Sequence, residues 1–252
     1  MSQDVLTETQ NGVLTITLNR PAKKNALTAA MYAAVADALA AAQADAAIRV
    51  VVLTGAGGAF TAGNDLNDFL SNPPRGEETP VARFLRGIST FEKPLIAAVA
   101  GVAVGVGTTM LLHCDLVYAA PSARLQLPFV NLALVPEAAS SLLLPRLVGH
   151  QKAAELFYFG EAFDAETAQS LGIVNAVVAE DQLLAHAQAR AALLAKKAPT
   201  AMKLAKQLMR QPAADVATQM AAESVHFGNQ LKSAEAREAM TAFFEKRAPN
   251  FG

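Results

Sequence analysis

The stretch from Pro94 to Leu112, PLIAAVAGVAVGVGTTMLL, decides how this chain folds. It carries no charge and is about as long as a membrane-spanning helix of roughly 20 residues. Glycines at positions 101, 105 and 107 interrupt it, and no cluster of basic residues flanks it to orient a span. A strand covered on both faces is also continuously apolar. We therefore expect a buried strand over Leu95 to Val99, a glycine-rich turn and a buried helix that starts near Gly107, and no membrane span.

The segments before this stretch predict alternating strands and helices. Val13 to Leu18 follows the turn-forming pair Asn11-Gly12 and alternates in polarity, which predicts a strand of an opening hairpin. Thr28 is a suitable N-cap for an alanine-rich helix over Ala29 to Ala44, and Ile48 to Leu53 is a second β-branched run. Strand, helix and strand in this order indicate a right-handed crossover in an α/β protein.

The segments after it continue this pattern and then become helical. Asp115 to Ala119 predicts another strand. Before the central stretch, Ser71 to Pro80 is rich in proline and polar residues, which predicts a surface loop. Three later stretches have helical patterns without strand signals between them: Gln182 to Lys196, Thr200 to Met209 and Ser233 to Lys246. We therefore expect an α/β core followed by a helical C-terminal part.

The composition is that of a globular protein without a strong electrostatic field. The chain has 252 residues, of which 52% are hydrophobic, so it can bury a large core. Its 21 Lys and Arg residues nearly balance 22 Asp and Glu residues, and a net charge of −1 attracts neither nucleic acid nor an anionic membrane. The single cysteine, Cys114, excludes an internal disulfide, and the N-terminal segment lacks the apolar region of a secretory signal. We expect a cytoplasmic protein.

Motifs for nucleotides and metals are absent from the sequence. The dinucleotide-binding pattern G-x-G-x-x-G requires a third glycine three residues after the second. That position holds Met110 after Gly105 and Gly107, and Phe60 after Gly55 and Gly57. The four histidines, at positions 113, 150, 186 and 226, have no second ligand at metal-binding spacing. We therefore expect neither a metal nor a separate cofactor.

Two glycine-containing turns could present main-chain N–H groups to one anionic oxygen. The first is Ala59 to Leu66 (AFTAGNDL), where small residues let the backbone approach a ligand. The second is Gly105 to Gly107, which opens a helix whose first N–H groups have no partner within the helix. Such turns are also common as structural links, so the residues alone leave both interpretations open.

Glu137 is the main candidate for a catalytic side chain. It lies in LVPEAASS, residues 134–141, among apolar and small residues whose packing would raise the pKa of its carboxyl group toward the range useful for proton transfer. The alternative is a glutamate at the start of a helix, following Pro136 and stabilised by the helix dipole. The residues alone leave this choice open as well.

Several segments, in order along the chain, resemble the crotonase (enoyl-CoA hydratase/isomerase) superfamily. They are NRP at 19–21 with KNAL at 24–27, FTAGNDL at 60–66, KPLIAAVAG at 93–101 with Asp115, GIVN at 172–175, and FFEKR at 243–247. The resemblance covers nearly the whole chain. It implies a spiral of ββα turns over residues 1–195 that holds the active site, and a helical region over 196–252 through which homotrimers or dimers of trimers assemble.

The resemblance also implies roles for individual residues. The main-chain N–H groups of Asn64 and Val106 would form an oxyanion hole for the thioester carbonyl of an acyl-CoA substrate. Coenzyme A would enter as part of that substrate, so no separate cofactor is implied. The residues that would lie against the substrate and its CoA are Ala62, Gly63, Asn64, Asp65, Leu66 and Phe129.

Acidic residues distinguish the reactions of this superfamily. Its hydratases place one glutamate just after the second glycine turn and another after a proline in the next loop, and those positions resemble Thr109 and Phe129 here. The segment with Glu137 is similar to that of peroxisomal-type Δ3,Δ2-enoyl-CoA isomerases. The resemblance thus implies an enzyme of fatty-acid β-oxidation that converts 3-enoyl-CoA to 2-enoyl-CoA with Glu137 as base. The alternatives are another crotonase reaction, such as hydration, or a non-catalytic acyl-CoA- or RNA-binding protein.

Overall fold

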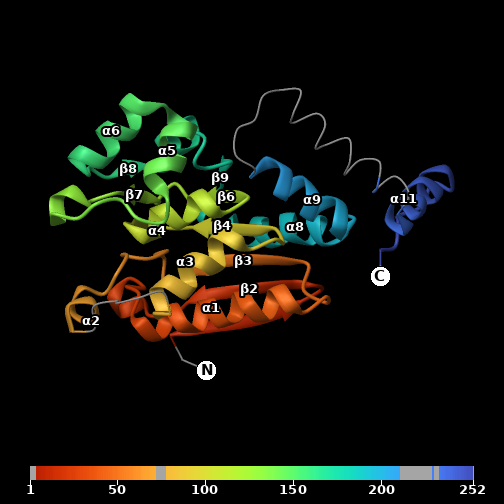
Figure 1. The fold of residues 1–252 in the computed structure, drawn as a ribbon, viewed down its shortest axis with the longest axis horizontal. Coiled ribbons are helices and arrows are strands. Elements are labelled where there is room, and N and C mark those ends of the chain that lie inside the picture. Colours follow the sequence, from red (N-terminus) through yellow and green to blue (C-terminus); the bar gives the residue numbers. More distant parts are fainter. Residues whose placement is uncertain (1–3, 72–77, 211–228, 230–232, 252) are drawn as a thin grey trace.

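Six strands form the main sheet of the protein (Figure 1). The computed structural model describes residues 4–71, 78–210, 229 and 233–251. The strand order is β1-β2-β3-β4-β6-β9, in which β1 pairs antiparallel with β2 and every later pair is parallel. The strands are β1 (Val5–Gln10), β2 (Val13–Leu18), β3 (Val50–Gly55), β4 (Leu95–Val99), β6 (Leu116–Ala119) and β9 (Ala176–Val177).

A second, three-stranded sheet lies beside the first (Figure 1). It consists of β5 (Val102–Val104), β7 (Arg124–Gln126) and β8 (Phe163–Asp164), in the order β5-β7-β8. β5 follows β4 closely in the chain, so the backbone steps from one sheet to the other within the stretch that decides the fold.

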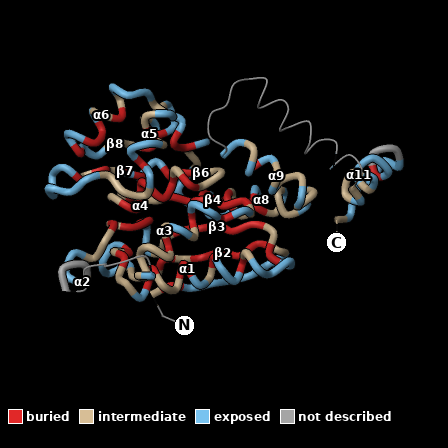
Figure 2. Tube along the Cα trace, in the orientation of Figure 1, coloured by how far each residue is buried: buried red, intermediate tan, exposed pale blue. Residues whose placement is uncertain are grey.

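Helices cover both faces of the main sheet. Alternate residues of β3 belong to different cores: Val51 and Leu53 pack with α1, whereas Val50 and Val52 pack with α8. Figure 2 shows these strands buried between the helices. The helices are α1 (Ala29–Ala44), α2 (Leu66–Ser71), α3 (Pro80–Thr90), α4 (Val106–Thr109), α5 (Ser140–Val148), α6 (His150–Phe159), α7 (Ala165–Ser170), α8 (Leu183–Ala195), α9 (Pro199–Met209) and α11 (Ala234–Phe244).

Most of the elements predicted from the sequence are confirmed, with some ends shifted. Asn11 and Gly12 form the hairpin turn with φ values of 51° and 75°, both left-handed as a two-residue turn of type I′ requires. The Thr28 hydroxyl caps α1 by accepting a hydrogen bond from Met31 N–H at 3.3 Å. The strand predicted at 48–53 lies instead at 50–55, because Ile48 N–H closes a turn onto Asp45 O at 3.1 Å.

Two further segments differ from the prediction. The helix expected near Gly107 begins at Val106 and remains α-helical for only four residues before the 3-10 turn η2 (Met110–His113). The loop predicted over Ser71 to Pro80 is shorter than expected at both ends, since Ser71 ends α2 and Pro80 starts α3, while residues 72–77 lie outside the described part. Within the described residues, no helix is both long and apolar enough to cross a membrane.

A buried lysine anchors α9 to the sheet. The Lys206 ammonium group, on a residue 5% exposed, donates hydrogen bonds to the Asp115 carboxylate at 2.6 Å and to Lys93 O at 2.7 Å. Burial lowers the pKa of Lys206, and the Asp115 carboxylate opposes that shift. Lys203, one turn earlier on the same helix, pairs with Glu92 at 2.7 Å with about half of its side chain exposed.

Lys206→Met should lower the free energy of unfolding by about 3 kcal/mol, because the partly buried Asp115 carboxylate loses its nearer charged partner and keeps only Arg210, 3.8 Å away. The matched variant Lys203→Met should cost less than about 1 kcal/mol, since exposed ion pairs contribute little. Urea unfolding followed by circular dichroism measures both values. Equal losses in the two variants would contradict the anchoring role of Lys206.

Candidate active site

The loop after β3 presents the main-chain N–H group of Asn64. In this Asn64 loop (Thr61–Asp65), Gly63 O accepts a hydrogen bond from Leu27 N–H at 2.7 Å, and Asp65 N–H donates to Leu27 O at 2.9 Å. In a parallel bridge of this kind, the residue between the two bonded neighbours turns its own N–H group to the opposite side. The Asn64 N–H therefore faces away from Leu27.

The second glycine turn presents the N–H group of Val106. Gly105 adopts φ 57° and ψ −116°, a conformation that residues with a β-carbon rarely adopt. Its N–H donates to Gln126 O at 2.9 Å, which ties the turn to β7. α4 starts at the next residue, so the Val106 N–H has no carbonyl within the helix to bind.

The two turns are in direct contact. Thr61 N–H donates to Val102 O at 2.9 Å, and Val104 N–H donates to Thr61 O at 3.0 Å, which forms a second parallel bridge. A β-carbon at Gly107 would lie 2.7 Å from Thr61 Cγ2, closer than side chains approach one another. Because α4 packs this closely on the Asn64 loop, the two turns that carry these amides are neighbours in the fold.

Glu137 reaches the same place from the loop before α5. Its carboxylate accepts a hydrogen bond from the hydroxyl group of Thr109, the last residue of α4. Burial raises the pKa of Glu137, and the hydrogen bond from Thr109 lowers it, with a net upward shift. One short helix thus carries both the Val106 amide and the Thr109 hydroxyl that binds the carboxylate. At the usual helical rise, residues 106 and 109 are about 4.5 Å apart along the axis.

Two alanines in the left-handed conformation shape the turn after Glu137. Ala138 and Ala139 each have φ 54°, which costs a residue with a β-carbon roughly 1–2 kcal/mol. Ser140 closes the turn by donating its N–H at 3.0 Å and its hydroxyl at 2.6 Å to Glu137 O. His113 Nε2 lies 2.8 Å from Ala138 O. The turn is therefore fixed from two sides, as backbone strain at a functional site requires.

Tyr32 joins this cluster from α1. Its hydroxyl donates to Asn64 Oδ1 at 2.5 Å, and its ring packs edge-on against Phe84 with centroids 5.1 Å apart. Burial raises the pKa of Tyr32 well above its usual value, and the negative charge of Glu137 adds to the shift. The sequence does not single out Tyr32, because a tyrosine in the apolar stripe of an alanine-rich helix looks like any other core residue.

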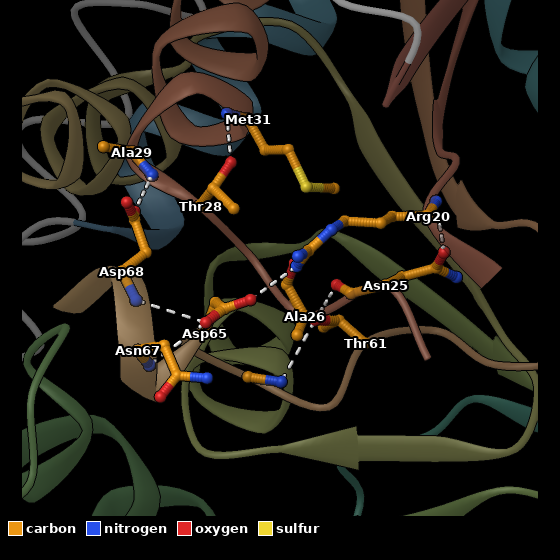
Figure 3. Close-up of polar contacts among 11 residues, drawn as sticks. Arg20, Asn25, Ala26, Thr28, Ala29, Met31, Thr61, Asp65, Asn67 and Asp68 are labelled. Atoms are coloured by element: carbon orange, nitrogen blue, oxygen red, sulfur yellow. Dashed lines mark hydrogen bonds and ion pairs between the residues drawn. The ribbon is translucent and has the colours of Figure 1, made fainter. Parts of the chain in front are cut away.

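Asp65, expected beside CoA, has its carboxylate engaged within the protein (Figure 3). It pairs with Arg20 at 2.6 Å, and this contact holds the pKa of Asp65 below its usual range. Its other oxygen accepts hydrogen bonds from Asn67 N–H at 3.1 Å and Asp68 N–H at 3.2 Å, which caps α2. Asp68 in turn accepts from Ala29 N–H at 2.6 Å. The Asn64 loop is thereby tied to the start of α1.

The other residues expected at the substrate lie in two groups. Ala62 and Gly63 belong to the Asn64 loop, and Leu66 opens α2 with 54% of its surface exposed. Phe129 is 7% exposed and packs on Phe157 of α6, with ring centroids 6.3 Å apart. Phe129 therefore packs in the apolar core beside α6, whereas the polar groups gather around the Asn64 loop and α4.

The cluster combines two main-chain N–H donors with one partly buried carboxyl group. Amide donors fixed in this way stabilise negative charge that develops on an oxygen atom. A carboxyl group with a raised pKa can accept a proton and return it near neutral pH. Among the residues that the structure describes, no three His, Cys, Asp or Glu side chains are grouped to hold a metal ion. The geometry suits proton transfer at a carbon atom next to a carbonyl group.

Comparison with known proteins identifies the family. The model of the enoyl-CoA hydratase/isomerase family matches residues 8–252. A solved structure from Magnetospirillum magneticum AMB-1, with the provisional description enoyl-CoA hydratase/carnithine racemase, is 44% identical, with a TM-score of 0.97 over 100% of both chains. The chain belongs to the enoyl-CoA hydratase/isomerase, or crotonase, family and has its α/β fold with C-terminal helices.

The named relatives include both isomerases and hydratases. 1,2-Epoxyphenylacetyl-CoA isomerase of Escherichia coli (strain K12) is 36% identical over 100% of this chain and 99% of its own. 2,3-Dehydroadipyl-CoA hydratase of the same organism is 36% identical over 98% of each chain. Enoyl-CoA delta isomerase 2 of Rattus norvegicus is 37% identical over 83% of this chain and 55% of its own. These similarities show an acyl-CoA enzyme and leave its reaction to be argued from the site residues.

Thr109→Val should raise the pKa of Glu137 further, since it preserves the shape of the side chain and removes the hydrogen bond that lowers the pKa. Thr109→Ser keeps the hydroxyl group and should leave the pKa near that of the wild type. A carbon-13 NMR titration of labelled glutamate carboxyl groups measures the shift, with Glu137→Gln to assign the signal. An unchanged titration in Thr109→Val would refute the link between these two side chains.

Proposed function

We propose that this protein is a Δ3,Δ2-enoyl-CoA isomerase that converts 3-enoyl-CoA to 2-enoyl-CoA. Glu137 is the base that carries the proton, and the N–H groups of Asn64 and Val106 bind the thioester oxygen. The hydrogen bond from Thr109 to Glu137 carries the proposal. Position 109 resembles that of a hydratase glutamate, and here it holds a hydroxyl group that anchors the only acid of the proposed mechanism.

The second position that resembles a hydratase acid supports the same conclusion. It holds Phe129, a buried aromatic residue. Hydration requires side chains that activate a water molecule and protonate C2, and neither Thr109 nor Phe129 can transfer a proton near neutral pH. An isomerase needs one base only, which Glu137 supplies. The name of the Rattus norvegicus relative, enoyl-CoA delta isomerase 2, agrees with this assignment.

In this mechanism one carboxyl group performs both proton transfers. The Glu137 carboxylate removes a proton from C2, and the electron pair of that C–H bond moves into a dienolate whose oxygen the two amides bind. The same proton returns to C4, so the double bond closes between C2 and C3 and the thioester carbonyl is restored. No water or second acid is consumed, and the carboxylate is regenerated.

The amides and the base make separate contributions to the rate. A preorganised donor at a developing oxyanion is worth about 3 kcal/mol, which matters here because a proton next to a thioester is only weakly acidic. A positioned general base adds about 10²- to 10⁴-fold. Exclusion of water by Phe129 and its apolar neighbours keeps the Glu137 carboxylate basic and suppresses hydration.

Product analysis tests the reaction directly. Incubation with 3-enoyl-CoA should accumulate 2-enoyl-CoA, whose conjugated thioester absorbs more strongly in the near ultraviolet. Incubation with 2-enoyl-CoA should give little 3-hydroxyacyl-CoA by chromatography. Hydration is the alternative to exclude, since 2,3-dehydroadipyl-CoA hydratase is 36% identical to this chain. Hydration at a rate comparable to isomerisation would overturn the proposal.

Glu137→Gln should lower turnover by at least about 10²-fold while acyl-CoA binding persists, because the variant keeps the side chain's shape and loses its basicity. In the wild type, turnover should rise with pH through the raised pKa of Glu137, since only the carboxylate is basic. Glu155→Gln, on the exposed surface of α6, serves as the control. Turnover of Glu137→Gln near the wild-type level would refute the mechanism.

Gly107→Ala should reduce turnover more than affinity for free CoA, because only the reacting carbonyl uses the Val106 amide. The physical cause is the contact of 2.7 Å that a β-carbon would make with Thr61 Cγ2. Thr61→Ser removes that methyl group and keeps the hydroxyl, so it should restore part of the turnover in the double variant. Steady-state kinetics and CoA titration measure both effects. Gly107→Val should show the larger loss, and equal losses of turnover and affinity would indicate misfolding instead.

The remaining expectations extend this proposal. We propose that the substrate and its CoA lie against residues 62–66 and Phe129, that residues 1–195 form the catalytic core, and that residues 196–252 mediate assembly into homotrimers or dimers of trimers. We further propose that the enzyme acts in fatty-acid β-oxidation in the cytoplasm. Size-graded 3-enoyl-CoA substrates would map the preferred acyl chain.

A further inference from the structure

The segment 27–32 holds both the main chain and the side chain of Asn64. Leu27 brackets its main chain with hydrogen bonds to the residues on either side, Gly63 and Asp65. Five residues later, the Tyr32 hydroxyl donates to the end of the Asn64 side chain at 2.5 Å. The first contact belongs to the backbone pattern of the fold, whereas the second depends on the identity of two side chains.

Tyr32 is itself rigidly placed. It is 2% exposed, its ring packs against Phe84, and it is the fourth residue of α1, whose start is capped by Thr28 and bonded to Asp68. A hydroxyl group fixed this firmly can fix its partner. The loop side of the contact needs such help, because Gly63, with φ 86°, immediately precedes Asn64 and lacks a side chain to restrain it.

We propose that Tyr32 is a positioning residue for the oxyanion hole, acting through the Asn64 side chain to fix the direction of the Asn64 N–H group. The inference rests on the oxyanion role proposed for Asn64, and not on which acyl-CoA reaction the enzyme performs. The hydroxyl proton of Tyr32 is committed to Asn64 Oδ1, so this residue is not the group that exchanges protons with the substrate.

Tyr32→Phe removes one oxygen atom and should lower kcat about tenfold while KM stays within about twofold. Deleting an oxyanion donor outright costs about 10²- to 10³-fold, and a donor that remains in place with a poorer direction should cost less. The pH at which activity rises, set by Glu137, should not move, since the tyrosine hydroxyl bonds Asn64 and not the carboxylate. A loss of that rise in Tyr32→Phe would overturn the proposal in favour of a proton-transfer role.

Infrared spectroscopy of a bound thioester reports the oxyanion hole without turnover. Butanoyl-CoA labelled with carbon-13 at C1 has no double bond to move, and hydrogen bonds to its carbonyl oxygen lower the carbonyl stretching frequency. Binding to the wild type should lower this frequency relative to the free thioester, and Tyr32→Phe should return part of the shift. A wild-type spectrum without the shift would refute the proposed oxyanion hole itself. A shifted wild-type spectrum that Tyr32→Phe leaves unchanged would overturn only the role of Tyr32.

Two further variants keep the inference open to contradiction if Tyr32→Phe folds poorly. Asn64→Ala removes the partner side chain and keeps the main-chain amide, so it should reproduce the loss of kcat and the infrared change. The double variant should lose no more than either single one, because both remove the same hydrogen bond. Additive losses would overturn the link. The matched control is Tyr118→Phe, which should retain wild-type kcat. Tyr118 is another buried tyrosine; it lies in β6 and packs against His186 of α8.

Discussion

The main-chain pairing of the Asn64 loop with its two neighbours is the constraint on which the site depends. Thr61 bonds Val102 and Val104 on one side, and Leu27 bonds Gly63 and Asp65 on the other. These bridges bring a turn after β3 against a turn after β5, which are formed by distant parts of the sequence. They also explain why small residues are required there, since a β-carbon at Gly63 would lie 2.7 Å from Val104 O. The orientation of the Asn64 and Val106 amides thus follows from backbone geometry, independently of the Glu137 side chain.

The position of Glu137 depends in turn on that backbone frame. Burial of a carboxyl group opposes its ionisation, and the hydrogen bond from Thr109 recovers part of the cost without adding a charge. Since Thr109 ends the same short helix that Val106 begins, a movement of α4 would displace the amide and the carboxylate together. The strained turn at Ala138 and Ala139, fixed by Ser140 and approached by His113, then sets the direction from which the carboxylate enters. The Glu137 carboxylate is therefore held by its environment rather than by a charged partner.

The sequence could predict those features that local patterns encode. The apolar run over Leu95 to Val99 became β4, and the Thr28 cap with its alanine-rich helix became α1, because strand burial and helix capping act over a few neighbouring residues. Contacts between distant segments left no such signal. The hydrogen bond between Tyr32 and Asn64 joins a helix to a loop. The Asp65 carboxylate pairs with Arg20 and caps α2. Helices α5 and α6 were not predicted either. α5 contains an internal proline, Pro145, and α6 exposes Tyr158 and Phe159 next to its buried apolar residues, so neither sequence has a clear helical pattern.

The presence of both isomerases and hydratases among the relatives has a physical basis, because main-chain and side-chain groups have separate parts in the site. In the proposed mechanism the main chain of the fold supplies the oxyanion amides, so substitutions of side chains would leave the stabilisation of a thioester enolate in place. The reaction is then determined by how many acids face that enolate and where they stand. Exchanging one residue on α4 or one in the following loop adds or removes a proton donor without altering the fold, so overall identity near 36% cannot separate the reactions. The side chains at positions 109, 129 and 137 are accordingly a better guide to the chemistry than the similarity of the whole chain.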